Sequence, residues 1–138
     1  MTDHQGREAI GLHILVAEDN PVNQMVVAKL LEKLGCSCAI AANGLECIER
    51  LSRDRYDLVL MDCMMPELDG LEATRRIRAS HSHCAEIPII AFSANAIESD
   101  HQACLAAGMN ECVDKPVTME RMRELLEKWR VKLMSSHS

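Results

Sequence analysis

Segments rich in apolar residues alternate with segments of helical periodicity along most of this chain. The apolar segments are short, as is typical of strands buried in a sheet, and predict strands over residues 13–18, 37–41, 58–62, 87–92 and 111–114. Apolar residues elsewhere recur every three or four positions, which predicts helices over residues 21–34, 45–53, 71–78, 96–107 and 119–133. Residues 1–12 and 134–138 are mostly polar, so we expect a flexible lead-in and a tail around one domain over residues 13–133.

Capping residues mark the predicted helix starts. Asn20 precedes Pro21, and Asn43, Asp69 and Thr118 stand before later helices. Alternation of strand and helix implies a parallel sheet with helices on both faces. The predicted fold is α/β: a doubly wound, flavodoxin-like five-stranded parallel sheet of order 2-1-3-4-5 with five helices. Its switch point lies between the first and third strands, where ligands bind in such sheets.

Composition narrows the function classes. The 138 residues are 48% hydrophobic and 26% charged, typical of a globular protein. A net charge of −6 argues against binding nucleic acid, which needs clustered Lys and Arg. No apolar stretch approaches the roughly 20 residues of a membrane helix, and no signal-peptide pattern follows Met1. We therefore expect a cytoplasmic chain, although a longer parent protein could be membrane-anchored.

The seven cysteines are scattered through predicted strands and helices, so we expect reduced thiols. Residues 81–84 (HSHC) hint at zinc but lack a second ligand pair at a recognisable spacing. A polar loop is the simpler interpretation of that segment.

Polar side chains follow four of the predicted strands. The first strand ends at Glu18 and Asp19, the third at Asp62, and the fourth and fifth are followed by Ser93 and Lys115. Parallel strands end at one edge of the sheet, so we expect these groups to share one pocket. Carboxylates packed together repel one another unless a cation intervenes, and oxygen ligands suit Mg²⁺.

Carboxylates, a divalent metal, an ammonium group and a hydroxyl together suit phosphoryl transfer, in which positioning and electrostatics do most of the catalysis. No other nucleophile candidate stands at a strand end, so one carboxylate must attack and an aspartyl phosphate must form. Asp62 is central in the predicted sheet and is our choice. Each of these residues taken alone could equally be an ordinary loop or turn residue.

Four segments together resemble the receiver domain of two-component response regulators. They are residues 14–20 (ILVAEDN), 61–70 (MDCMMPELDG), 88–96 (PIIAFSANA) and 114–116 (DKP). The resemblance covers residues 13–129 and implies that Asp62 accepts a phosphoryl group from a phosphohistidine. Residues 18–24 (EDNPVNQ) most resemble receivers of hybrid histidine kinases, which implies a histidine kinase or a histidine phosphotransfer domain as partner.

The resemblance also implies individual roles. Mg²⁺ would be held by Asp19, Asp62 and the backbone carbonyl of Met64, with Glu18 acting mainly through water. Ser93 and Lys115 would bind phosphoryl oxygens. The chain would be no turnover enzyme by itself, although it would catalyse its own phosphorylation and dephosphorylation.

Other positions would tune or read the site. Met64 and Asn95 occupy the family's variable positions and would tune the lifetime of the phosphoryl group. Cys112 stands where the family often has an aromatic switch residue, so we expect readout through the first helix and the pocket loops instead. No output domain is recognisable, so we expect no DNA binding by this chain, and a monomer or weak dimer.

Three alternatives stay open. A degenerate receiver would act only as a protein docking domain. A small phosphatase with an aspartyl nucleophile would need a second acid two residues after it, where this chain has Met64. Cys63, beside Asp62, could be redox-active, although a small residue in a tight loop explains it more simply.

Overall fold

Five strands and five helices alternate in the computed structural model, which describes residues 9–63, 69–80, 83–93, 98–114 and 117–136. Their order along the chain is the one predicted from the sequence. The elements are β1 (His13–Ala17), α1 (Pro21–Lys33), β2 (Ser37–Ala41), α2 (Gly44–Arg53), β3 (Leu58–Asp62), α3 (Gly70–Ala79), β4 (Ile89–Ser93), α4 (Glu98–Ala107), β5 (Glu111–Asp114) and α5 (Met119–Ser136).

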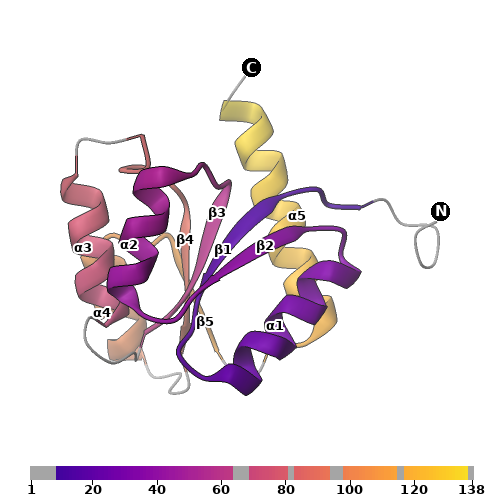
Figure 1. The fold of residues 1–138 in the computed structure, drawn as a ribbon, viewed down its shortest axis with the longest axis horizontal. Helices are drawn as coiled ribbons and strands as arrows, with labels where there is room; N and C mark the ends of the chain where they lie inside the picture. The colour runs from indigo at the N-terminus through magenta and orange to yellow at the C-terminus, as the bar shows by residue number, and fades with distance from the viewer. Residues whose placement is uncertain (1–8, 64–68, 81–82, 94–97, 115–116, 137–138) are drawn as a thin grey trace.

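The strands form one sheet in the order β2-β1-β3-β4-β5, with every neighbouring pair parallel. The predicted fold is therefore confirmed. Helices α1 and α5 lie against one face of the sheet, and α2, α3 and α4 lie against the other (Figure 1). The strand order reverses between β1 and β3, which places the topological switch point at their carboxyl ends.

Two apolar layers, one on each face of the sheet, make up the core. Successive residues of β3 alternate between them: Leu58 and Leu60 belong to the layer under α1 and α5, whereas Val59 and Met61 belong to the other. Because β3 is buried on both faces, its apolar run is not interrupted by polar residues. Asp62, the polar residue that ends this run, is therefore held at the end of a strand that is packed on both faces.

Side-chain caps begin the helices at the predicted positions. Asn20 Oδ1 accepts hydrogen bonds from the backbone N–H groups of Val22 (2.8 Å) and Asn23 (3.1 Å). Asn43 and Asp69 cap α2 and α3 in the same way. Each cap satisfies N–H groups that lack an intrahelical partner, which sets the residue at which each loop ends.

The packed part of the chain begins before residue 13. Ile10 and Leu12 are buried, and the backbone N–H groups of Ile10 and Gly11 donate to carbonyls just after α1 at 2.9 and 3.0 Å. Their apolar side chains join the layer under α1 and α5, and the division into a lead-in over residues 1–12 and a domain over residues 13–133 stays a prediction.

At the other end, α5 continues to Ser136, past the boundary at residue 134 where a tail was expected. Among the described residues, no helix combines the length and apolarity needed to cross a membrane.

Candidate functional site

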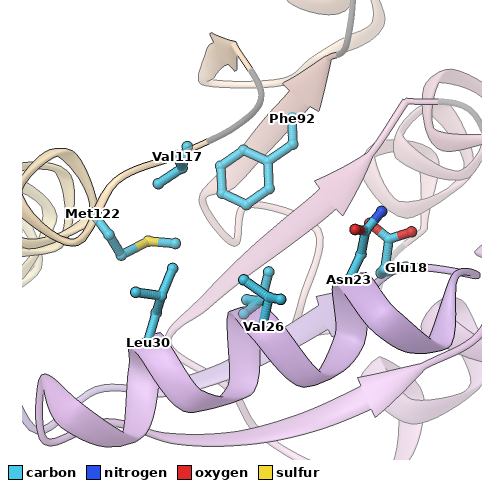
Figure 2. A pocket seen from close by; sticks show the side chains of 8 residues that line it. Glu18, Asn23, Val26, Leu30, Phe92, Val117 and Met122 are labelled. Atoms are coloured by element: carbon cyan, nitrogen blue, oxygen red, sulfur yellow. The ribbon is translucent and has the colours of Figure 1, made fainter.

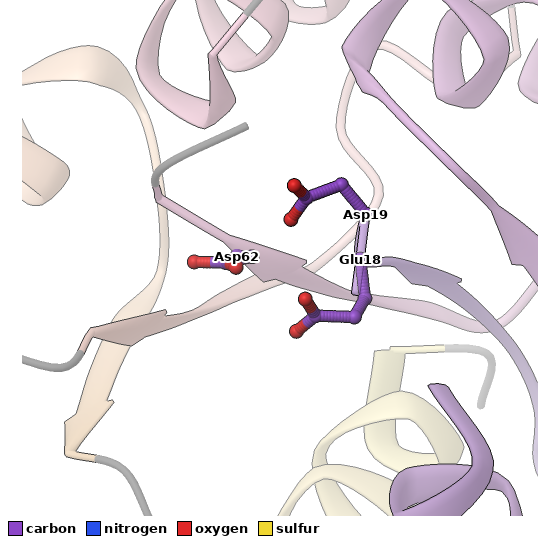
Figure 3. Close-up of side chains that lie close together, drawn as sticks. All are labelled: Glu18, Asp19 and Asp62. Atoms are coloured by element: carbon purple, nitrogen blue, oxygen red, sulfur yellow. The ribbon is translucent and has the colours of Figure 1, made fainter. Parts of the chain in front are cut away.

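The pairing register of the central strands brings acidic residues together. Ala17, the last residue of β1, pairs with Met61 of β3, so the residues that follow each of them, Glu18 and Asp62, stand side by side. One carboxylate oxygen from each of Glu18, Asp19 and Asp62 lies within 4.8 Å of the other two (Figure 3). The convergence expected at the switch point is therefore present.

Burial strengthens the electrostatic repulsion among these three carboxylates. Glu18 and Asp62 are only 3% and 9% exposed, whereas Asp19 is open to solvent. Negative charges this close repel one another, more strongly where water is excluded, so a cation bound among them is favoured. All three side chains offer oxygen and none offers nitrogen or sulfur, a donor set that fits Mg²⁺ better than zinc.

Local hydrogen bonds hold Glu18 in place. Its Oε2 atom accepts a hydrogen bond from the backbone N–H of Asn20 (3.1 Å), and its backbone carbonyl accepts one from the side-chain amide of Gln24 (2.7 Å). Both donors lie at the start of α1, whose amino end carries a partial positive charge. These two hydrogen bonds hold the turn that carries Asp19 against the start of α1.

Asp62 is positioned by close packing against the start of α3. A Cβ atom built on Gly70 would lie 2.5 Å from the backbone oxygen of Asp62, so only glycine allows this approach. The Gly70 N–H donates to the carbonyl of Cys63 at 3.1 Å, and Asp69 caps the helix behind it. The start of α3 therefore lies directly against the end of β3.

The comparisons with known proteins bear directly on this arrangement. A family model, that of the response regulator receiver domain, matches residues 14–127. The chain belongs to the response regulator receiver domain family. The resemblance stated from the sequence is confirmed.

Individual relatives of this receiver domain include parts of much longer proteins. It is 40% identical over 120 residues to hybrid signal transduction histidine kinase K of Dictyostelium discoideum, a match that covers 83% of this chain and 10% of that relative. The chain thus spans about a tenth of the length of that curated relative.

Solved structures similar to this receiver domain include one with a bound ion and one with a partner protein. The receiver domain of a sensor histidine kinase from Pseudomonas aeruginosa PAO1, with a magnesium ion coordinated in its active site cleft, is 43% identical, with a TM-score of 0.81 and 88% and 98% of the two chains covered. The receiver domain of Ssk1 from Saccharomyces cerevisiae, in complex with the histidine phosphotransfer protein Ypd1, is 27% identical, with a TM-score of 0.81 and 91% and 92% covered.

One further predicted site residue of the receiver domain, Ser93, falls at the end of a strand. β4 ends at Ser93, whose backbone pairs with Asp114 of β5. The predictions on Met64, Asn95, Lys115 and the Ser93 side chain lie outside the described residues. They stay predictions.

Cys112 lies on β5, pairs with Ala91 of β4 and is partly buried against the layer under α2, α3 and α4. The prediction that the missing aromatic changes the readout of this receiver domain stays open.

An apolar cavity of about 270 Å³ lies beside the acidic cluster, between α1 and the elements around α5. Figure 2 shows Val26 and Leu30 of α1 on one side of it, Met122 of α5 and Phe92 of β4 on the other, and Glu18 at one end. Sequence reasoning did not predict this cavity, because its walls come from segments up to about a hundred residues apart in the chain.

A thiol pair also escaped the sequence analysis. The Sγ atoms of Cys63 and Cys104 lie 3.3 Å apart, although 41 residues separate them in the chain. No local motif signals a contact of this kind. Burial, and then the neighbouring Cys104 thiol, raise the pKa of the Cys63 thiol above its ordinary value.

Proposed function

We propose that this receiver domain accepts a phosphoryl group from a phosphohistidine onto Asp62, as a Mg²⁺-dependent step of a two-component phosphorelay. The observation that supports this most is the buried Asp62 carboxylate at the end of the central strand, within 4.8 Å of the Glu18 and Asp19 carboxylates. A carboxylate built into a rigid strand end and flanked by metal-binding acids is what an aspartyl-phosphate intermediate requires.

Asp62 supplies the nucleophile. One of its carboxylate oxygens attacks the phosphorus of the phosphohistidine, a phosphorus–oxygen bond forms, and the phosphorus–nitrogen bond breaks with its electron pair passing to the imidazole. Glu18, Asp19 and Asp62 would hold Mg²⁺, together with the Met64 backbone carbonyl that the resemblance implies. When bound, the ion neutralises the clustered acids and the phosphoryl oxygens.

The other proposed roles follow the family resemblance. The Ser93 hydroxyl and the Lys115 ammonium group bind phosphoryl oxygens, and Met64 and Asn95 tune how long the phosphoryl group survives. The domain changes its own phosphorylation state and turns over no separate substrate. In the cell we place it in the cytoplasm, as a monomer or weak dimer that binds no nucleic acid.

The phosphohistidine partner, a histidine kinase or a histidine phosphotransfer domain, docks on α1. Val22, Met25 and Val26 share one side of that helix and are 67%, 60% and 52% exposed, which is unusual for apolar side chains so close together. Val22 follows Asp19 by three residues, and Val26 lines the cavity beside Glu18. A partner seated there would bring its phosphohistidine to Asp62.

Phosphorylation tests the first part of this proposal. Incubate the chain with Mg²⁺ and a small phosphodonor such as acetyl phosphate, and measure its intact mass. We expect the addition of one phosphoryl group that Asp62→Asn abolishes. Asp54→Asn is the matched control, because Asp54 is an exposed acid beyond the end of α2. An unmodified wild type, or an adduct that survives Asp62→Asn, would favour a domain that only docks.

Transfer from a protein donor tests the docking surface. We expect Val26→Lys to slow transfer from a phosphorylated histidine phosphotransfer domain while leaving modification by acetyl phosphate unchanged. Leu105→Lys is the matched control, because Leu105 is equally exposed (53%) but lies on α4, across the sheet. Equal slowing by both variants would contradict docking on α1.

A further inference from the structure

The Cys63 and Cys104 sulfurs are held close together by the fold. Cys63 directly follows Asp62, and Cys104 lies on the buried side of α4. A disulfide bond is about 2.05 Å long, so the two Sγ atoms, now 3.3 Å apart, must approach by roughly 1.2 Å to form one. Rotation about χ1 of either cysteine moves its sulfur while the backbone stays in place.

Hydrogen bonds fix the backbone on both sides of this pair. The Cys63 N–H donates to the carbonyl of Phe92 and its carbonyl accepts from Gly70, each at 3.1 Å. The Cys104 carbonyl accepts from the N–H of Met109 at 3.1 Å. The short distance between the sulfurs is therefore a property of the fold, and it gives the thiols a high effective concentration toward each other.

We propose that Cys63 and Cys104 form a reversible disulfide by exchange with a low-molecular-weight disulfide, and that this bond slows phosphorylation of Asp62. The Cys63 thiolate attacks the small disulfide, forms a mixed disulfide and releases one small thiol. The Cys104 thiolate then attacks the Cys63 sulfur and releases the second. The two protein thiols lose two electrons and two protons, and the small disulfide is reduced to two thiols.

The bond would act on Asp62 through its neighbour. It would tie the first residue of the loop after β3 to α4, and Cys63 cannot shift without moving the peptide that joins it to Asp62. A displacement of about 1 Å at a reacting group can cost about a hundredfold in rate. We therefore expect phosphorylation at least about tenfold slower in the oxidised domain, a consequence that rests on the proposed function.

Buried thiols exchange slowly because little thiolate is present at neutral pH. The first experiment is therefore an equilibrium one: incubate the full chain in buffers of reduced and oxidised glutathione, block remaining thiols and measure the mass. Cleavage by trypsin together with a glutamyl endopeptidase separates Cys104 from its neighbours, because Glu98 and Glu111 flank its peptide. We expect one bond joining the Cys63 and Cys104 peptides.

This first experiment does not involve phosphorylation, so it stands or fails separately from the proposed function. Absence of a disulfide across the whole glutathione range would overturn the proposal. A bond from Cys63 to Cys112 or Cys84 would overturn it as well, since both lie in the same apolar layer or against it.

The second experiment measures phosphorylation by acetyl phosphate in the reduced and oxidised forms. We expect oxidation to slow the wild type, a thiol reductant to restore it, and Cys104→Ala to be insensitive to oxidation. Cys38→Ser, on the edge strand β2, is the control that keeps the wild-type response. If Cys104→Ala unfolds, Cys104→Ser replaces it with a side chain closer in size. An oxidised domain that carries the mapped bond and is phosphorylated at the reduced rate would refute regulation.

Discussion

Replacement of Gly70 by alanine tests whether close packing positions Asp62. The added Cβ would lie 2.5 Å from the Asp62 backbone oxygen and 3.1 Å from the Cys63 Cα atom. Ordinary contact begins near 3.4 Å, so the two segments must separate by about 0.9 Å. Both contacts are with backbone, which a side-chain rotation cannot relieve.

The expected cost follows from these distances. Forcing a methyl group into a packed site costs about 1–3 kcal/mol. Alanine is the better helix former by at most about 1 kcal/mol, and less in the first turn, where Gly70 stands. We therefore expect Gly70→Ala to lower the free energy of unfolding by about 1–2 kcal/mol. A shift of nearly 1 Å at Asp62 should also slow phosphorylation by about a hundredfold.

Two measurements separate these effects. Urea unfolding, followed by the fluorescence of the single tryptophan, Trp129, reports the stability. Intact mass against time with acetyl phosphate reports the rate. Gly11→Ala is the matched control: Gly11 has φ +77° with nothing within 4 Å of its Cβ position, so alanine there costs about 1–2 kcal/mol without touching the site. The reasoning is refuted if Gly70→Ala is phosphorylated at the wild-type rate, or if Gly11→Ala slows phosphorylation equally.

Three further predictions concern stability. Asn20→Ala removes the acceptor for the Val22 and Asn23 N–H groups and should lower the free energy of unfolding by about 1 kcal/mol, measured in urea. Asn20→Asp keeps a capping oxygen and should retain most of the wild-type stability. Equal unfolding midpoints for Asn20→Ala and the wild type would contradict the role of Asn20 as a cap. Met122→Ala, at a fully buried side chain, should cost about 2–5 kcal/mol and Met122→Leu less than about 1.5 kcal/mol, as thermal unfolding can check. Burial raises the pKa of Glu111, but hydrogen bonds from Lys128 and Trp129 outweigh it, so the folded pKa lies below 4.5. Ionised Glu111 therefore stabilises the fold above pH 4.5, and this stabilisation is lost as the pH falls through the lowered pKa. Between pH 7 and pH 3 the melting temperature of Glu111→Gln should fall less than that of the wild type. Identical falls in the two proteins would contradict this prediction.

Local patterns were enough to predict the fold because each element carries its own signal. The β3 run is apolar on both faces, and Asn20, Asn43 and Asp69 cap helices through bonds to residues two or three positions away. Such short-range interactions are encoded in neighbouring residues. The burial of Ile10 and Leu12 was not predicted, because the apolar layer that they join is completed by α5, more than a hundred residues further along the chain.

The acidic site was predictable for a related reason. Parallel strands joined by right-handed crossovers all end at one edge of the sheet. Glu18, Asp19 and Asp62 each end a recognisable strand, so their convergence needed only the strand order and no side-chain detail.

Other properties depend on how distant segments pack, and these only the tertiary structure decided. The 3.3 Å distance between the Cys63 and Cys104 sulfurs, the close approach of Gly70 to Asp62 and the cavity between α1 and α5 all depend on the angle and separation of packed elements. Hydrophobic periodicity determines which face of a helix is buried but not which atoms it meets, because burial is non-directional. The sequence by itself thus determined the fold and the acidic centre, and tertiary packing decided what surrounds Asp62.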